Sequence, residues 1–153
     1  MSRSYQQELD LVRREYQSAK FAIAYVSLNW SKQGINSYQK DLGPEDLRRT
    51  SARLEVTYII RLFATFEGLL KQYMIAYYPE IKLPDKPKVG WFISRVAQLQ
   101  NPRINTVLCK RIESVRDCRN DLIHTGRPVA PLMTFEEAMQ DLAKYLDKLP
   151  PPR

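Results

Sequence analysis

The sequence predicts an all-α protein, a bundle of four or five helices that forms a single domain over residues 1–153. Apolar residues recur at spacings of three and four, which places them on one face of a helix. No segment shows a convincing strand pattern. Only five glycines occur, and four of them stand where a helical pattern should break, namely Gly34, Gly43, Gly90 and Gly126.

The first two expected helices are long. One covers residues 4–30, where apolar side chains recur at mixed three- and four-residue spacings. The next runs from Pro44 to about Tyr78. Proline suits its first turn, and Glu45 and Asp46 complement the positive end of the helix dipole. Its apolar positions are Leu47, Leu54, Tyr58, Leu62, Phe66, Leu69, Tyr73 and Tyr77.

Two shorter helices should follow a stiff, basic connection. Residues 79–88 contain three prolines and three lysines, so they cannot continue a helix. We expect a third helix over about residues 89–99. Pro102 suits the first turn of a fourth helix, whose apolar stripe stops at residues 124–126.

The last expected helix is separated from the fourth by Pro128 and Pro131. Thr134 and Glu137 have the spacing of a capping box, in which each side chain satisfies a backbone N–H of the first turn. The apolar stripe that follows ends at Leu146, which predicts a helix over residues 135–146.

The net charge indicates which binding partners the protein favours, and the cysteines indicate its cellular compartment. The formal net charge is +7, from 24 basic and 17 acidic side chains, which modestly favours polyanions such as RNA. Cys109 and Cys118 lie nine residues apart on one expected helix, too far to form a disulfide, so we expect reduced thiols and a cytoplasmic location. Residues 21–28 are too short an apolar stretch for an export signal or a membrane span, so we expect no membrane association.

The most chemically informative segment is residues 116–124, which ends in the only histidine of the chain, His124. Histidine can gain or lose a proton near neutral pH, and the arginines of this segment, Arg116 and Arg119, are fixed cations. Asn120 adds an amide between Arg119 and His124. Together these groups suit phosphoryl chemistry on RNA without a metal. The structural alternative is a helix end capped by His124 and Gly126.

Two charged residues occupy positions that the helical periodicity reserves for apolar ones. The stripe of the fourth helix continues from Val115 to Arg119, and an arginine there should be paired, line a cleft or face another subunit. Glu67 stands in the most apolar part of the second helix. If the two helices pack antiparallel, Glu67 should pair with Arg116 or Arg119, either to orient a site or as a purely structural ion pair.

Helical geometry also predicts a homodimer. At about 100° per residue, Asn120 and His124 share one side of the helix, whereas Arg119 and His124 are about 140° apart. One regular helix therefore cannot easily aim both at one phosphate. Either the last turn unwinds near Gly126, or two copies of the helix face each other across a two-fold axis and share a cleft.

These residues carry a resemblance to a known family. The segment "RDCRNDLIHTG", downstream of the long helix "YIIRLFATFEGLLKQYM", resembles the R-x4-6-H motif of the HEPN superfamily, in which a polar residue commonly follows the arginine. The similarity covers roughly residues 44–126. Members that a partner nucleotidyltransferase modifies carry Tyr two residues after the histidine. Gly126 stands there in this chain, which argues against that subgroup.

The resemblance implies an all-α fold, a dimer that brings two motifs together and, in many members, metal-independent endoribonuclease activity in toxin-antitoxin, phage-defence or RNA-processing systems. Arg119 and His124 would be catalytic, and Asn120 would position the substrate or a partner. The implied partners are RNA, a second copy of the chain and, in toxin systems, an antitoxin protein. We expect no cofactor and no zinc site, because one histidine and two separated cysteines form no ligand cluster.

Two other functions compete with the ribonuclease. The first is a catalytically silent HEPN-like module that binds RNA or a protein. The second is a generic helical adaptor, for which His124 should be buried against its own core. We interpret the remaining aromatic and basic features as structural: Trp91 as a core residue and Lys82 to Lys88 as a solvated loop, although aromatics can stack bases and lysines can contact phosphates.

Overall fold

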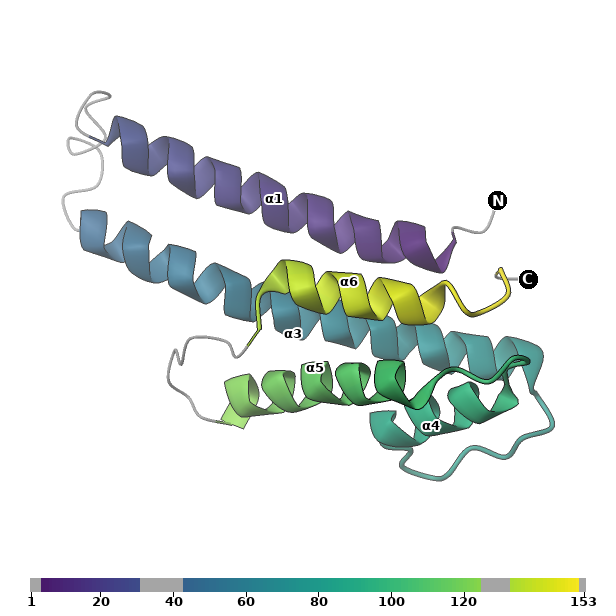
Figure 1. Cartoon of the computed structure of the whole chain (residues 1–153). Coiled ribbons are helices and arrows are strands. Elements are labelled where there is room, and N and C mark those ends of the chain that lie inside the picture. The colour runs from purple at the N-terminus through teal and green to yellow at the C-terminus, as the bar shows by residue number, and fades with distance from the viewer. Residues whose placement is uncertain (1–3, 31–42, 125–132, 152–153) are drawn as a thin grey trace.

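The computed structural model describes residues 4–30, 43–124 and 133–151. Within these ranges the chain is all-α, as predicted, and contains no strand. Figure 1 shows the helices in chain order. They are α1 (Tyr5–Asn29), α3 (Pro44–Tyr77), α4 (Val89–Leu99), α5 (Thr106–His124) and α6 (Phe135–Leu146).

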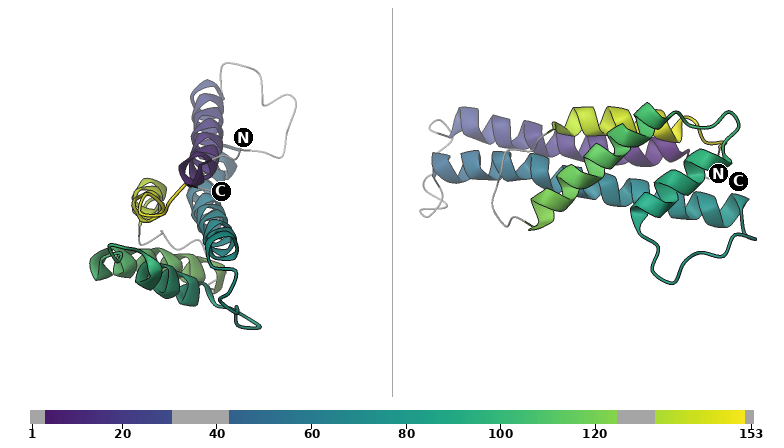
Figure 2. Two further views of the ribbon diagram at one scale, coloured as in Figure 1. Left: turned by 90° about the vertical axis from the view of Figure 1, so that its right-hand side faces the viewer. Right: turned by 60° about the horizontal axis from the view of Figure 1, so that its bottom comes forward.

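The long helix α3 organises the bundle, because each of the four other helices in the described ranges contacts it. α1 runs antiparallel to α3 along most of its length, and α6 packs against both (Figure 1). α4 and α5 lie on another side of α3, as the two views of Figure 2 show. α5 runs in the direction opposite to α3, which is the arrangement that the expected ion pair of Glu67 required. The surface of α3 that meets α4 and α5 carries the candidate site.

The core lies between α3 and the helices that pack against it, and α5 adds Ile112 and Val115 to it. α3 contributes eight buried residues, all of them between Ile59 and Met74. α1 contributes buried residues only up to Tyr16. The largest fully buried side chains include Phe63, Phe66 and Tyr145, and the Tyr145 hydroxyl donates to the backbone oxygen of Ile93 at 2.6 Å. Burying a large apolar side chain contributes about 1.5–3 kcal/mol to stability, so this region of the bundle holds the fold together.

One predicted boundary is wrong. The fourth helix begins at Thr106, not at Pro102. The Asn101–Pro102 peptide bond is cis, and the buried residue Ile104 lies in the connection before the helix. The side-chain oxygen of Asn105 accepts hydrogen bonds from the backbone N–H of Val107 (2.6 Å) and Leu108 (3.2 Å). Because Asn105 satisfies these first free N–H groups, it sets the start of the helix.

The predicted capping box of the last helix is confirmed. Thr134 accepts from the Glu137 backbone N–H, and the Glu137 carboxylate accepts from the Thr134 backbone N–H at 2.8 Å. Glu55 of α3 accepts from the next N–H, that of Phe135, at 3.0 Å. The N-terminus of α6 is therefore capped both by its own residues and by a side chain of α3. The expected breaks at Gly34, Gly126, Pro128 and Pro131 lie outside the described residues.

Both cysteines are free: Cys109 is half-buried and Cys118 is buried. None of the described helices has both the length and the apolar character that crossing a membrane requires.

Candidate functional site

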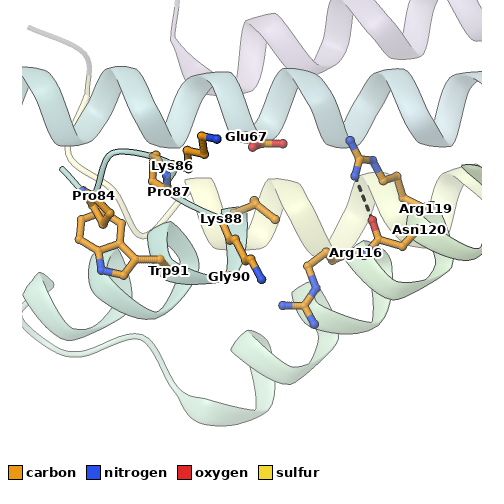
Figure 3. Close-up of a pocket in the computed structure, with 11 residues that line it drawn as sticks. Glu67, Pro84, Lys86, Pro87, Lys88, Gly90, Trp91, Arg116, Arg119 and Asn120 are labelled. Atoms are coloured by element: carbon orange, nitrogen blue, oxygen red, sulfur yellow. Dashed lines mark hydrogen bonds between the residues drawn. The ribbon is translucent and has the colours of Figure 1, made fainter.

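A pocket of about 850 Å³ opens between α3, the connection before α4, the first turn of α4 and the middle of α5. Figure 3 shows it with its lining side chains. Concave sites of this volume are typical of small-ligand binding. The chemically active part of the lining consists of Glu67, Lys86, Lys88, Trp91, Arg116, Arg119 and Asn120.

Four of the five site residues expected from the sequence line this pocket. Glu67 comes from α3, and Arg116, Arg119 and Asn120 come from α5. The fifth, His124, does not line it. His124 is the last residue of α5 and is exposed. The described part of one chain therefore assembles the predicted cations and the amide, and leaves the predicted proton-transfer group outside.

Arg119 is held partly inside the bundle. Its guanidinium carbon lies 6.0 Å from the centre of the Phe63 ring, close enough for a cation–π contact. Its Nη1 donates to the side-chain oxygen of Asn120 at 2.9 Å. Its Nε is buried and has no hydrogen-bond partner among the described residues. The position of Arg119 in the apolar stripe of the helix thus forms part of the wall of a cleft. This location keeps the guanidinium half-buried.

The same contact fixes the Asn120 amide. A guanidinium has only donors, so Asn120 must present its oxygen to Arg119. The amide N–H groups of Asn120 are then left to donate elsewhere. Because Asn120 lines the pocket, these N–H groups are available to an acceptor bound there, such as a phosphate oxygen.

Arg116 lines the pocket, and its side chain is 30% exposed. Its Nε and Nη2 both donate to Asp117, at 3.1 and 2.8 Å. On the other side, its Nη1 lies 2.8 Å from the position that a Cβ on Gly90 would take. Only a glycine leaves room for the guanidinium there, so α4 and α5 together set the position of Arg116.

The expected ion pair between Glu67 and Arg116 or Arg119 is not formed. Within the described ranges, no Lys or Arg nitrogen lies within 4.0 Å of the half-buried Glu67 carboxylate. The physical reason is local: each arginine uses its neighbour on α5 as a partner, and on α3 the Arg119 guanidinium meets the Phe63 ring rather than Glu67. The periodicity predicted that Glu67 and the two arginines lie on facing helices. It could not predict the distance between their charged groups.

Sequence reasoning missed part of the lining. Trp91, interpreted as a core residue, is half-buried and lines the pocket, and Lys86 and Lys88, interpreted as a solvated loop, also line it. The sequence carries one signal for these residues: a proline-rich, basic connection leads directly into a helix whose first turn contains Gly90 and Trp91. The pocket therefore carries four cations and one carboxylate, which favours an anionic ligand.

His124 ends a helix that stays regular to its last residue. Unwinding of the last turn, one of the two routes that would bring His124 toward Arg119, is therefore not seen up to His124, and Gly126 lies outside the described residues. The side chain is exposed, so the burial that a generic adaptor predicts is also not observed.

Within the described ranges, no three His, Cys, Asp or Glu side chains are grouped as metal ligands would be. Comparison of the chain with protein-family models, with curated proteins and with solved structures gave no match.

Proposed function

We propose that this protein is a metal-independent endoribonuclease of the HEPN type, with RNA as its substrate and its active site completed between two copies of the chain. One observation carries the proposal: a single pocket collects Arg116, Arg119 and Asn120 with Lys86 and Lys88. Two guanidinium groups and an oriented amide suit the oxygens of a phosphodiester. The half-buried position of Arg119 strengthens its interaction with such a charge relative to water.

In the proposed reaction, the 2′-hydroxyl of RNA attacks the adjacent phosphorus. A bond forms between the 2′-oxygen and phosphorus, and the bond from phosphorus to the 5′-oxygen breaks. The products are a 2′,3′-cyclic phosphate and a 5′-hydroxyl. His124 accepts the proton of the 2′-hydroxyl, and the leaving 5′-oxygen takes a proton from an imidazolium or from water. Arg119 stabilises the charge that develops on the phosphoryl oxygens.

The position of His124 is the reason for proposing two chains. Arg119 faces the pocket of its own chain, whereas His124 is exposed at the end of the same helix. Two α5 helices related by a two-fold axis would place the His124 of one chain near the Arg119 of the other.

The test is incubation of the purified protein with labelled single-stranded RNA in excess EDTA, followed by analysis of the product ends. We expect cleavage that leaves 2′,3′-cyclic phosphate and that is lost in His124→Ala. Single-stranded DNA of the same sequence should not be cleaved, because it lacks the 2′-hydroxyl. Cleavage of DNA at a similar rate, or cleavage by the folded His124→Ala variant at the wild-type rate, would contradict the mechanism.

The second candidate is a catalytically silent HEPN-like module that binds RNA through the same pocket. The absence of His124 from the pocket of a single chain favours it. Its signature would be a folded wild-type protein that binds RNA in a salt-dependent manner and cleaves none of a varied set of RNAs.

A further inference from the structure

The pocket has a second end, away from the arginines, that phosphate chemistry does not explain. Figure 3 shows Trp91 with Pro84 and Pro87 at one end, Arg116, Arg119 and Asn120 at the other, and the Glu67 carboxylate between the two ends on the α3 side. A phosphate needs only the basic end. The apolar end and the carboxylate indicate a ligand that also carries a flat, hydrogen-bonding ring.

Trp91 is suited to hold such a ring. It stands in the first turn of α4, where its indole meets the buried Phe92 ring edge to face, with centroids 5.2 Å apart and an interplanar angle of 82°. This contact anchors the indole on the core side, while the residue remains half-buried and lines the pocket. Aromatic side chains in a basic groove commonly stack the bases of single-stranded nucleic acid.

Glu67 is the residue that limits which base fits. A carboxylate in a pocket with four cations would repel a phosphate, and it makes no ion pair with a described Lys or Arg nitrogen. Its two oxygens accept hydrogen bonds and donate none. A half-buried carboxylate that no described Lys or Arg pairs with is therefore available to two donors of a ligand.

We propose that the Trp91 end of the pocket is a guanine subsite. Guanine is the standard RNA base whose Watson–Crick edge offers two adjacent N–H donors, at N1 and N2, which match the two oxygens of one carboxylate. The base stacks on Trp91, the Glu67 carboxylate accepts from N1 and N2, and Lys86 donates to O6. The phosphate of the same nucleotide lies at Arg116 and Arg119. This inference rests on the proposed function, which it deepens: the enzyme prefers RNA with guanosine at the cleaved position.

The chain offers a direct optical test, because Trp30 and Trp91 are its only two tryptophans. In a Trp30→Phe protein, Trp91 is the only indole, and its fluorescence reports a stacked base. We titrate this protein with the 3′-monophosphates of guanosine, adenosine, cytidine and uridine. We expect saturable quenching, with an affinity for the guanosine nucleotide about tenfold or more above that for the uridine nucleotide, since a bidentate contact discriminates to this degree.

The matched variants are Glu67→Gln and Glu80→Gln in the Trp30→Phe background. Glutamine keeps the size of Glu67 but replaces one acceptor oxygen with a donor, so the guanosine preference should fall to within about twofold. Glu80 is exposed and does not line the pocket, so its variant should keep the preference. Circular dichroism spectra and melting temperatures verify that both variants fold.

Equal affinity for all four nucleotides would overturn the inference, as would a guanosine preference that survives Glu67→Gln. So would the absence of quenching in a folded protein. Nucleoside monophosphates contain no bond for the enzyme to cleave, so the result is independent of catalysis. Guanosine-selective binding without RNA cleavage would sustain the subsite and refute the nuclease, whereas RNA cleavage without base preference would do the reverse.

Discussion

Arg119 combines a poor structural position with a useful chemical one. Its Nε is a buried donor without a described partner, which costs about 1–3 kcal/mol of stability. Among the described residues, its guanidinium keeps one side-chain hydrogen bond, to Asn120, and the contact with the Phe63 ring. Such a position is expected of a group retained for its ligand rather than for the fold.

Replacing Arg119 should therefore separate stability from function. Methionine fills a similar space without the buried donor, so we expect Arg119→Met to unfold with a free energy within about 1 kcal/mol of the wild type, or higher. RNA cleavage should fall by roughly 10²- to 10³-fold, the usual loss when a group that stabilises transition-state charge is removed. Denaturant titration and single-turnover cleavage measure the two effects.

Arg111→Met is the matched control, because Arg111 is on the same helix, is 57% exposed and pairs only with Asp141 among the described residues. This variant should cleave RNA like the wild type. A loss of several kcal/mol of stability in Arg119→Met would show that the arginine supports the fold instead.

Gly90 offers a second test at the residue scale. A Cβ at this position would come within 2.8 Å of the Arg116 Nη1, which is the end of a flexible side chain, so Gly90→Ala should move the guanidinium and leave the fold intact. We expect an unchanged or slightly higher melting temperature, because alanine is the better helix former, and an RNA affinity several-fold lower. Fluorescence anisotropy with labelled RNA measures the affinity.

Gly68 provides the comparison within the same protein. A Cβ added there meets nothing within 4 Å, so Gly68→Ala should raise the free energy of unfolding by roughly 0.4–1 kcal/mol. RNA affinity should stay the same. If both alanine variants lose affinity equally, the contact between Gly90 and Arg116 is not what matters.

At the scale of an element, the start of α6 shows how local signals fix a helix. Thr134, Glu137 and the Glu55 carboxylate from α3 satisfy the first N–H groups of this helix. Thr134→Ala removes the hydroxyl that accepts from the Glu137 N–H, and it should cost about 1 kcal/mol of stability, as N-cap removals do. Thermal unfolding of the variant and the wild type gives this difference.

The same cap makes part of the stability depend on pH. Hydrogen bonds from the Thr134 backbone N–H and hydroxyl hold the pKa of Glu137 below its ordinary value of 4.5. The contribution of this carboxylate is therefore complete above about pH 4.5 and is lost as the pH falls through the lowered pKa. Glu137→Gln should flatten the loss of stability on acidification, as measured by urea titrations between neutral and acid pH. An acid dependence equal to that of the wild type would exclude the cap as a contributor.

At the scale of the whole molecule, the proposed active site needs two chains, and mixing variants tests this. Arg119→Ala and His124→Ala should each be inactive. If one site takes Arg119 from one chain and His124 from the other, a mixed dimer keeps one intact pair, so combining the two proteins after mild dissociation should restore part of the cleavage activity. Single-turnover cleavage by the mixture measures the recovery. No recovery in a mixture shown to contain mixed dimers would place both groups of a site in one chain.

The sequence predicted the elements closely. Periodicity and breakers gave α3 from Pro44 and α4 over residues 89–99, because glycines, prolines and capping residues act over one turn of chain. The predicted start of α5 at Pro102 was wrong, because Pro102 suits a first turn but Asn105, three residues later, caps the helix. The sequence also showed that Arg119 and Glu67 break an apolar pattern. It did not predict the distance between these two side chains.

Sequence alone thus determined the all-α class, the order of the helices and the charged residues that stand at apolar positions of their helices. Only the tertiary structure decided that Trp91, Lys86 and Lys88 share a pocket with Arg119, and that His124 does not. The physical reason is that helix formation and capping are local, whereas a pocket depends on how rigid helices cross. The packing of α4 and α5 on α3 fixes those crossings through side chains that are far apart in the sequence.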